Sequence, residues 1–182
     1  MNNTTFVNSS GLDNTDSGNY STAYDMGILM SYAMKNENFR IITGTKKHIV
    51  KTNYKRYSWT NKNKILGTNN INGGKTGYTE KAKRTLVSTA SKNNINLIAV
   101  TIKDSDDWNT HKTLYEKIFD NYTKFKVLNK NTFKVENDNY YDSLYIKNDI
   151  YNCNVFVPPV SDNSSNKKII IAGCNSRFYN VK

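Results

Sequence analysis

Three strand-like segments stand close together in the middle of the chain and restrict its fold more than any other feature. They cover Gly74–Thr79, Thr85–Ala90 and Asn96–Ile102, and the last two are rich in the β-branched and apolar residues that favour strands. Between them, Lys92-Asn93-Asn94 is typical of a tight turn. Connections this short favour three adjacent antiparallel strands.

A helix is predicted on either side of these strands. Ser21 or Thr22 can cap the first, which runs to about Asn36. Its apolar face comprises Tyr24, Ile28, Leu29, Tyr32 and Ala33. The second ends near Tyr122 and should pack on the sheet. Its N-cap candidates are Asp104, Ser105 and Asp106, and its core-facing residues are Trp108, Tyr115, Ile118, Phe119 and Tyr122.

The segments between these elements are less regular. The chain up to Tyr20 is rich in Asn, Ser, Gly and Asp and is expected to form an extended loop. Phe39–Thr52 alternates loosely, which suggests a strand or a bent pair of strands interrupted near Gly44. Tyr57–Asn72 is predicted to be a loop.

The pattern changes after Val127 to short β-like pieces separated by Asn, Asp and Pro. These pieces are Thr132–Val135, Ser143–Ile146, Asn154–Val157 and Lys168–Ala172. We therefore predict an α+β chain in two units. Residues 1–128 would hold an antiparallel sheet with flanking helices, and residues 129–182 the start of a β-rich second domain.

The net charge of +11 is concentrated in one part of the chain. From Lys35 to Lys92 there are fourteen Lys and Arg residues against Glu37 and Glu80, which gives 14 − 2 = +12. Such a field favours anionic partners such as nucleic acid, anionic lipid or an acidic wall polymer. A solvated basic face kept for solubility is the alternative.

Other features of the sequence exclude several kinds of site. Cys153 and Cys174 have neither a Cys-x-x-Cys pattern nor a nearby His pair, so no metal or other cofactor is expected. One disulfide and two free thiols both remain open. No apolar run reaches the roughly 18 residues that span a bilayer, and no export signal is expected at the N-terminus.

One short motif suggests a chemical task, namely Lys75-Thr76-Gly77 in the stretch Ile71–Thr79. On a strand beside a site, the Lys75 ammonium can steer an anionic substrate and stabilise developing charge. The Thr76 hydroxyl can bind a terminal carboxylate. Gly77 leaves room for a substrate backbone alongside the strand, as in β-augmentation.

The surroundings of this motif resemble the serine-type D-Ala-D-Ala carboxypeptidases, the low-molecular-mass penicillin-binding proteins. The likeness covers roughly Thr5–Phe125 and rests on linked signatures in the family's order. These signatures are Phe6-Val-Asn-Ser-Ser-Gly-Leu12, Tyr20-Ser-Thr-Ala-Tyr-Asp25, Asn61-Lys-Asn-Lys-Ile-Leu66, Gly73-Gly-Lys-Thr-Gly-Tyr-Thr79, Ala82, Leu86-Val-Ser-Thr-Ala90 and Leu97–Val100.

The resemblance implies a partial transpeptidase or β-lactamase-like domain and an acyl-transfer mechanism. In such enzymes a serine of a Ser-x-x-Lys helix attacks the D-Ala-D-Ala peptide bond, and its lysine acts as base. A Ser-x-Asn loop relays protons, and Lys-Thr-Gly holds the substrate carboxylate. Lys75, Thr76 and Gly77 would be the substrate-binding residues here, with Lys75 also acting electrostatically in catalysis. The same resemblance implies a location in the cell envelope.

The chain departs from the family's pattern at the nucleophile, which should precede the Phe6 signature. Ser164-Ser-Asn-Lys167 and Ser165-Asn-Lys-Lys168 fit Ser-x-x-Lys, but they follow Lys75 in a polar loop. Ser17-Gly18-Asn19 fits Ser-x-Asn, but it follows the Phe6 signature and is predicted to be an ordinary turn. We therefore expect neither the nucleophile nor its lysine in this chain.

Smaller features complete the sequence-based picture of the site. Lys83 stands where the family usually has a small residue, and with Lys81 and Arg84 it makes an unusually basic turn. The two histidines, His48 and His111, have no catalytic partner at a recognisable spacing and are expected to be bystanders. The two tryptophans, Trp59 and Trp108, are interpreted as packing residues.

Three hypotheses for function follow. The first is a truncated or split D-Ala-D-Ala carboxypeptidase of peptidoglycan maturation, inactive alone, whose partners are the stem peptide and a chain carrying the N-terminal half. β-Lactams would bind only if that half is supplied. The alternative is a non-catalytic module that binds wall peptide. A nucleic-acid binder rests on charge alone, without a recognisable module, and nucleic acid is not expected as a partner.

Overall fold

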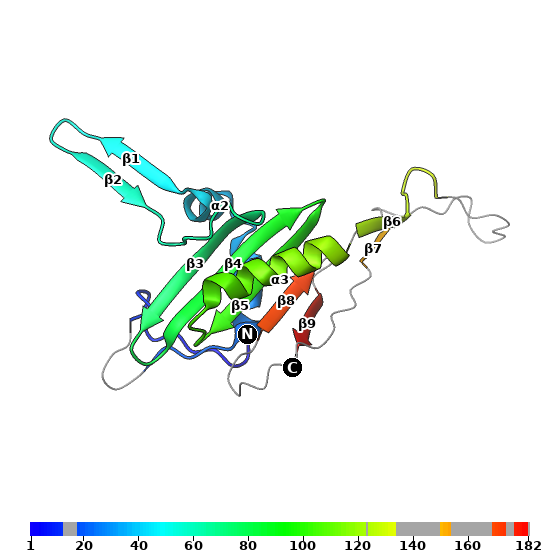
Figure 1. Ribbon diagram of the computed structural model, residues 1–182, viewed down its shortest axis with the longest axis horizontal. Helices are drawn as coiled ribbons and strands as arrows, with labels where there is room; N and C mark the ends of the chain where they lie inside the picture. Colours follow the sequence, from blue (N-terminus) through cyan, green and yellow to red (C-terminus); the bar gives the residue numbers. More distant parts are fainter. Residues whose placement is uncertain (13–17, 123, 134–149, 154–168, 174–176, 182) are drawn as a thin grey trace.

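The computed structural model describes residues 1–12, 18–122, 124–133, 150–153, 169–173 and 177–181. Its centre is a five-stranded antiparallel sheet in the order β3-β4-β5-β8-β9 (Figure 1). The first three strands are consecutive in the chain: β3 spans Ile71–Thr79, β4 spans Lys83–Lys92 and β5 spans Ile95–Ile102. The antiparallel strands predicted from the sequence are therefore confirmed.

The turn between β4 and β5 explains why these strands pair so directly. Asn93 and Asn94 adopt positive φ angles of 51° and 61°, which is the conformation that a two-residue type I′ hairpin requires. Asparagine tolerates this region better than most residues. Lys92 consequently pairs with Ile95, and the register continues without a shift to Thr85 and Ile102.

Two helices cover opposite faces of the sheet. Helix α1 (Ala23–Ala33) is capped by Thr22, whose side chain accepts a hydrogen bond from the Asp25 amide. Helix α3 (Asp107–Asn121) lies across the other face (Figure 1). Both predicted helices are confirmed, although α1 ends three residues earlier than expected and the Asp106 side chain caps no backbone N–H of α3. The apolar face predicted for α1 is wrong, because the helix buries Ala23, Asp25, Gly27 and Met30 whereas Tyr24 and Tyr32 are exposed.

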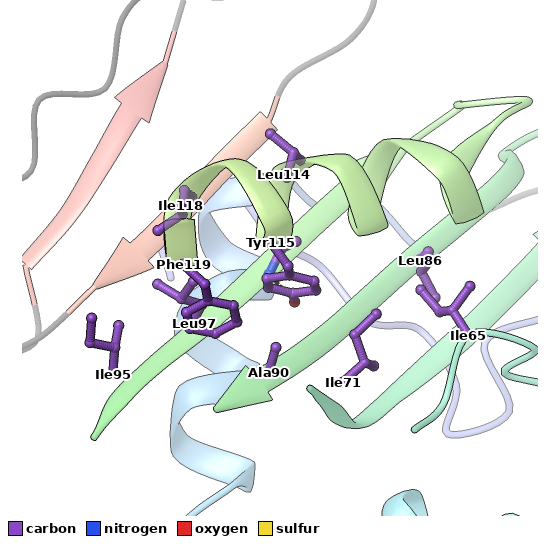
Figure 2. Close-up of a cluster of buried hydrophobic side chains, with 11 residues drawn as sticks. Ile65, Ile71, Leu86, Ala90, Ile95, Leu97, Leu114, Tyr115, Ile118 and Phe119 are labelled. Atoms are coloured by element: carbon purple, nitrogen blue, oxygen red, sulfur yellow. Dashed lines mark hydrogen bonds between the residues drawn. The ribbon is translucent and has the colours of Figure 1, made fainter. Parts of the chain in front are cut away.

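The larger part of the core lies between α3 and the sheet. Figure 2 shows Tyr115 and Phe119 pointing from the helix onto the apolar residues of the strands. The buried cluster comprises Ile65, Ile71, Leu86, Ala90, Ile95, Leu97, Ala99, Leu114, Tyr115, Ile118 and Phe119. A smaller cluster on the α1 face comprises Ala23, Met30, Val87 and Val100. The sheet is thus buried on both faces.

Two predictions for the segment before β3 are partly wrong. The strand expected in Phe39–Thr52 is present only at Lys47–Lys51, and the loop expected in Tyr57–Asn72 begins within a strand. Residues Glu37–Gly44 form helix α2, because Asn36 caps it by accepting a hydrogen bond of 3.1 Å from the Phe39 amide. Part of the predicted loop is β2 (Arg56–Thr60), which pairs with β1 (Lys47–Lys51) in a separate two-stranded hairpin. Every residue of both strands is exposed, so burial provides no apolar alternation from which to predict them.

The C-terminal strands divide between two sheets. β6 (Lys124–Leu128) pairs with β7 (Ile150–Cys153), whereas β8 (Ile169–Gly173) pairs with β5 in the central sheet and β9 (Arg177–Val181) pairs with β8. The strand predicted at Lys168–Ala172 is confirmed. Those predicted at Ser143–Ile146 and Asn154–Val157 lie outside the described residues, as does the second half of Thr132–Val135, whose described half follows a turn instead of forming a strand. The division near residue 129 stays a prediction.

Candidate functional site

The Lys-Thr-Gly motif lies on β3, the edge strand of the central sheet (Figure 1). Lys75, Thr76 and Gly77 stand opposite residues 87, 86 and 85 of β4. In the described part of the chain, no strand pairs with the other edge of β3. The backbone N–H and C=O groups along that edge can therefore receive an extended peptide.

The motif side chains point to alternate faces of the strand. Lys75 pairs with Val87, which belongs to the core on the α1 face, and Thr76 pairs with Leu86, which lies under α3. Lys75 is exposed and Thr76 is half-buried. Within the described residues the Lys75 ammonium makes one hydrogen bond, to the Thr76 carbonyl. The ammonium therefore has donors left for an anionic ligand.

Two glycines let β3 approach β4 closely. Gly74 has a φ of 142°, and a Cβ there would lie 2.4 Å from the Val87 carbonyl oxygen. A Cβ on Gly77 would lie 2.4 Å from the Thr85 hydroxyl. Gly77 thus serves the packing of β3 on β4, in addition to the role expected from the sequence of leaving room for a substrate backbone. A larger residue at Gly74 would require the backbone itself to shift.

Two asparagines lie between the β1–β2 hairpin and the motif strand, and the sequence alone assigned neither of them a role. The side-chain amide of Asn61 donates to the carbonyls of Thr43 and Thr45 at 3.2 and 3.1 Å, where α2 ends. Asn63 is 4% exposed, its Oδ1 accepts from the Ile65 amide, and its Nδ2 lies beside Gly74. The Asn-x-Asn spacing in the family-like signature was the available signal.

The basic turn after the motif is largely paired. Lys83 forms an ion pair with Glu80 at 3.1 Å, and Lys81 donates to the Tyr20 hydroxyl at 3.2 Å. The Tyr78 hydroxyl also donates to Glu80, and this bond, followed by Lys83, lowers the pKa of the Glu80 carboxyl. Lys83 has a φ of 57°, which explains why a small residue suits this position.

Arg84, the third base of the turn, is fixed on the core side. Its guanidinium forms an ion pair with Asp107, the first residue of α3. The same group lies 5.0 Å from the centre of the Trp108 ring, in cation–π geometry. Trp108 also packs against the core, as predicted. These contacts connect the β3–β4 turn region to the start of α3.

One buried cluster has the composition of a serine–histidine catalytic pair but not its accessibility. Ser88 Oγ lies 2.7 Å from His111 Nδ1 and 2.9 Å from the Tyr115 hydroxyl, and Thr101 Oγ1 lies 3.1 Å from His111 Nε2. Ser88 and His111 are both 0% exposed. Burial lowers the pKa of His111 to about 4, so the ring is neutral at pH 7. The cluster joins α3 to the sheet.

The remaining sequence candidates do not meet the motif in the described structure. Asn19 holds the N-terminal loop, since its Oδ1 accepts from the Val7 amide at 3.0 Å. Its predicted partner Ser17, and both Ser-x-x-Lys matches beginning at Ser164 and Ser165, lie outside the described residues. Trp59 is 54% exposed on the hairpin, where it packs on the rings of Tyr57 and His48 and not in the core.

Among the described residues, no group of three or more His, Cys, Asp or Glu side chains could hold a metal ion. None of the helices described is long and apolar enough to cross a bilayer. Cys153 ends β7, whereas Cys174 lies outside the described residues, so the pairing of the two cysteines is not tested.

Comparison with known proteins shows the family of this chain. The family model described as D-alanyl-D-alanine carboxypeptidase, peptidase S11, matches residues 1–106, which include β3, β4 and β5. The chain belongs to this family. It is also 38% identical over 102 residues to D-alanyl-D-alanine carboxypeptidase DacF of Bacillus subtilis (strain 168), covering 55% of this chain and 26% of that protein.

Solved structures agree with the family assignment. A D-alanyl-D-alanine carboxypeptidase from Mycobacterium tuberculosis H37Rv superposes with a TM-score of 0.57 at 26% identity, covering 63% of this chain and 46% of the other. An evolved putative penicillin-binding protein homologue from M. tuberculosis gives a TM-score of 0.56 at 23% identity, with 63% and 47% covered, and supports the fold alone. The chain therefore spans about a quarter of DacF and just under half of each solved structure.

Proposed function

We propose that this chain carries the substrate-holding part of a D-Ala-D-Ala carboxypeptidase that acts on peptidoglycan stem peptides in the cell envelope. Lys75 attracts the terminal carboxylate, and the Thr76 hydroxyl donates a hydrogen bond to it. The peptide then lies along the open edge of β3 beside Gly77. The observation that carries this proposal is a Lys-Thr-Gly motif with an exposed Lys75 on an edge strand within the family-matched residues.

Acyl transfer also needs a serine whose oxygen adds to the carbonyl carbon of the penultimate D-Ala. The bond to the terminal D-Ala then breaks, and that D-Ala leaves with the proton. In the described structure Lys75 has no serine partner. We therefore propose that the chain is a truncated or split form, inactive alone, and that a segment bearing the family's Ser-x-x-Lys must complete it.

Mass measurement tests the catalytic half of this proposal. Incubation of the chain with a penicillin should leave its intact mass unchanged, because a covalent adduct requires the nucleophilic serine. Supplying a segment that bears the Ser-x-x-Lys and Ser-x-Asn motifs should produce the adduct. A stable adduct on this chain alone would contradict the split-form proposal.

Peptide titration tests the binding half. A peptide ending in D-Ala-D-Ala should bind saturably, and the same peptide with an amidated C-terminus should bind at least tenfold more weakly, since a charge-assisted contact contributes about 1.5–3 kcal/mol. Lys75→Ala should weaken binding to the same extent, whereas the control Lys103→Ala, an exposed lysine after β5, should not. Equal affinity in both variants would exclude Lys75 as the carboxylate-binding residue.

The alternative, a non-catalytic wall-peptide-binding module, is favoured by the same open edge of β3. It predicts peptide binding without adduct formation even when the missing segment is supplied. The two experiments together therefore separate the alternatives.

A further inference from the structure

The β1–β2 hairpin stands apart from the packed body of the protein. It projects away from the central sheet, with the turn at its far end (Figure 1). All ten strand residues are exposed, and Tyr54 in the turn is 98% exposed. Neither buried cluster includes a hairpin residue. Packing in the core therefore does not account for the choice of side chains on this hairpin.

One face of the hairpin carries aromatic and apolar side chains. Residues opposite each other across a strand pair share a face, which places His48 with Trp59 and Val50 with Tyr57. The Trp59 ring stacks on Tyr57 at 5.4 Å and 8° and on His48 at 6.2 Å and 15°. Trp59 remains 54% exposed and Tyr57 39% exposed. The rings thus stack on one another while remaining accessible to solvent.

The opposite face of the hairpin carries most of its basic residues, together with Ile49 and Ser58. Lys47, Lys51 and Arg56 lie on the opposite face, and Lys55 lies 5.3 Å from the centre of the Tyr57 ring. The sequence contains no acidic residue between Glu37 and Glu80. None of the ion pairs within the described residues involves the hairpin. Its four cations therefore remain available to an anionic partner.

We propose that the β1–β2 hairpin docks on an anionic lipid surface. Trp and Tyr favour the depth of the lipid headgroups, where one end of the ring is apolar and the other is hydrated. Lys and Arg gain from the surface potential of anionic lipids and can extend from the interface to the phosphates. Charge alone would suit a soluble polyanion, whereas exposed Trp59, Tyr57 and Val50 on one face also suit an apolar boundary.

Vesicle binding tests this proposal on the whole chain. The chain should bind vesicles of phosphatidylcholine mixed with phosphatidylglycerol, more weakly as salt is raised, and should bind pure phosphatidylcholine far less. Replacing Lys47, Lys51 and Arg56 together by Gln should weaken binding by roughly 100-fold, at about fivefold per cation. The control replaces Lys35, Lys103 and Lys117 by Gln, which removes the same charge outside the hairpin and should have a much smaller effect. Equal binding by both triple variants would overturn the proposal.

Tryptophan fluorescence tests the aromatic face separately. The emission of Trp59 should shift to the blue on anionic vesicles, so the shift should persist in Trp108→Phe and disappear in Trp59→Phe. A shift that persists in Trp59→Phe would overturn the proposed orientation. Binding to polyphosphate or a single-stranded oligonucleotide without binding to vesicles would make the partner a soluble polyanion and overturn the lipid proposal. Lys75→Ala should leave vesicle binding unchanged, so this result is independent of the peptide-binding site.

Discussion

The central sheet and the β1–β2 hairpin use similar residues for different purposes. Both contain β-branched, aromatic and basic side chains, yet Leu86, Ala99 and Val100 of the sheet are 0% exposed while every strand residue of the hairpin is exposed. Strand propensity therefore forms both structures, but burial stabilises only the sheet. The contribution of a strand to stability thus depends on what covers its faces, and matched substitutions in the two regions can test this comparison.

The largest contrast is expected from truncating one apolar side chain in each region. Leu86→Ala should lower the free energy of unfolding by about 2–5 kcal/mol, because it leaves a cavity between α3 and the sheet. Val50→Ala on the exposed hairpin should change it by no more than about 0.5 kcal/mol. Urea unfolding followed by circular dichroism measures both. Similar losses would mean that the hairpin packs in solution.

The next contrast concerns the two histidines. The pKa of His111 is about 4 in the folded chain and about 6.5 when unfolded, so the unfolded chain binds more protons between these values. Stability should be fully present above pH 6.5 and fall by about 3 kcal/mol as the pH is lowered to 4. The free energy of unfolding, measured across this pH range, should fall with decreasing pH in wild type and equally in the hairpin variant His48→Gln.

The variant His111→Gln supplies the outcome that would contradict this account. It should unfold more easily at pH 7, because the hydrogen bonds to Ser88 and Thr101 change, but its stability should depend less on pH over the same range. An unchanged slope in His111→Gln would assign the acid sensitivity to another group.

A smaller contrast is expected for two tyrosine hydroxyls. The Tyr115 hydroxyl accepts from the Ala99 amide at 3.1 Å and donates to the Ser88 carbonyl at 2.7 Å, all within the core. Tyr115→Phe should therefore cost about 1–3 kcal/mol, since buried polar groups lose their partner. Tyr57→Phe on the hairpin should be neutral within about 0.5 kcal/mol. Thermal unfolding of the two variants checks this, and equal midpoints would show that the buried network contributes little.

The smallest effect is expected from removing the hairpin. The Asn61 backbone N–H donates to the Lys46 carbonyl at 2.8 Å, so the two ends of the hairpin meet. Replacing residues 48–59 by Asn-Gly, which forms a two-residue turn, should change the stability of the sheet by no more than about 0.5 kcal/mol. The shortened chain should lose vesicle binding while keeping its peptide binding. A large loss of stability would show that the hairpin supports the core.

Sequence reasoning succeeded where one local signal agreed with burial. The Asn93-Asn94 turn, the apolar strands around it and the periodic face of α3 all predicted elements that the structure contains. It failed at Glu37–Gly44, because the loose alternation of this segment favours a strand whereas the Asn36 cap starts a helix. It also failed at Arg56–Thr60, because an exposed strand has no apolar period.

The sequence by itself determined the family, the motif and the pairing of β3, β4 and β5, since local turns and linked signatures are written in consecutive residues. Only the tertiary structure decided that Lys75-Thr76-Gly77 lies at an open edge and that Asn63 and Gly74 meet beside it. It alone showed that His111 is enclosed while Trp59 is exposed. Edge position and burial depend on which distant segments pack together, and no stretch of neighbouring residues encodes that packing.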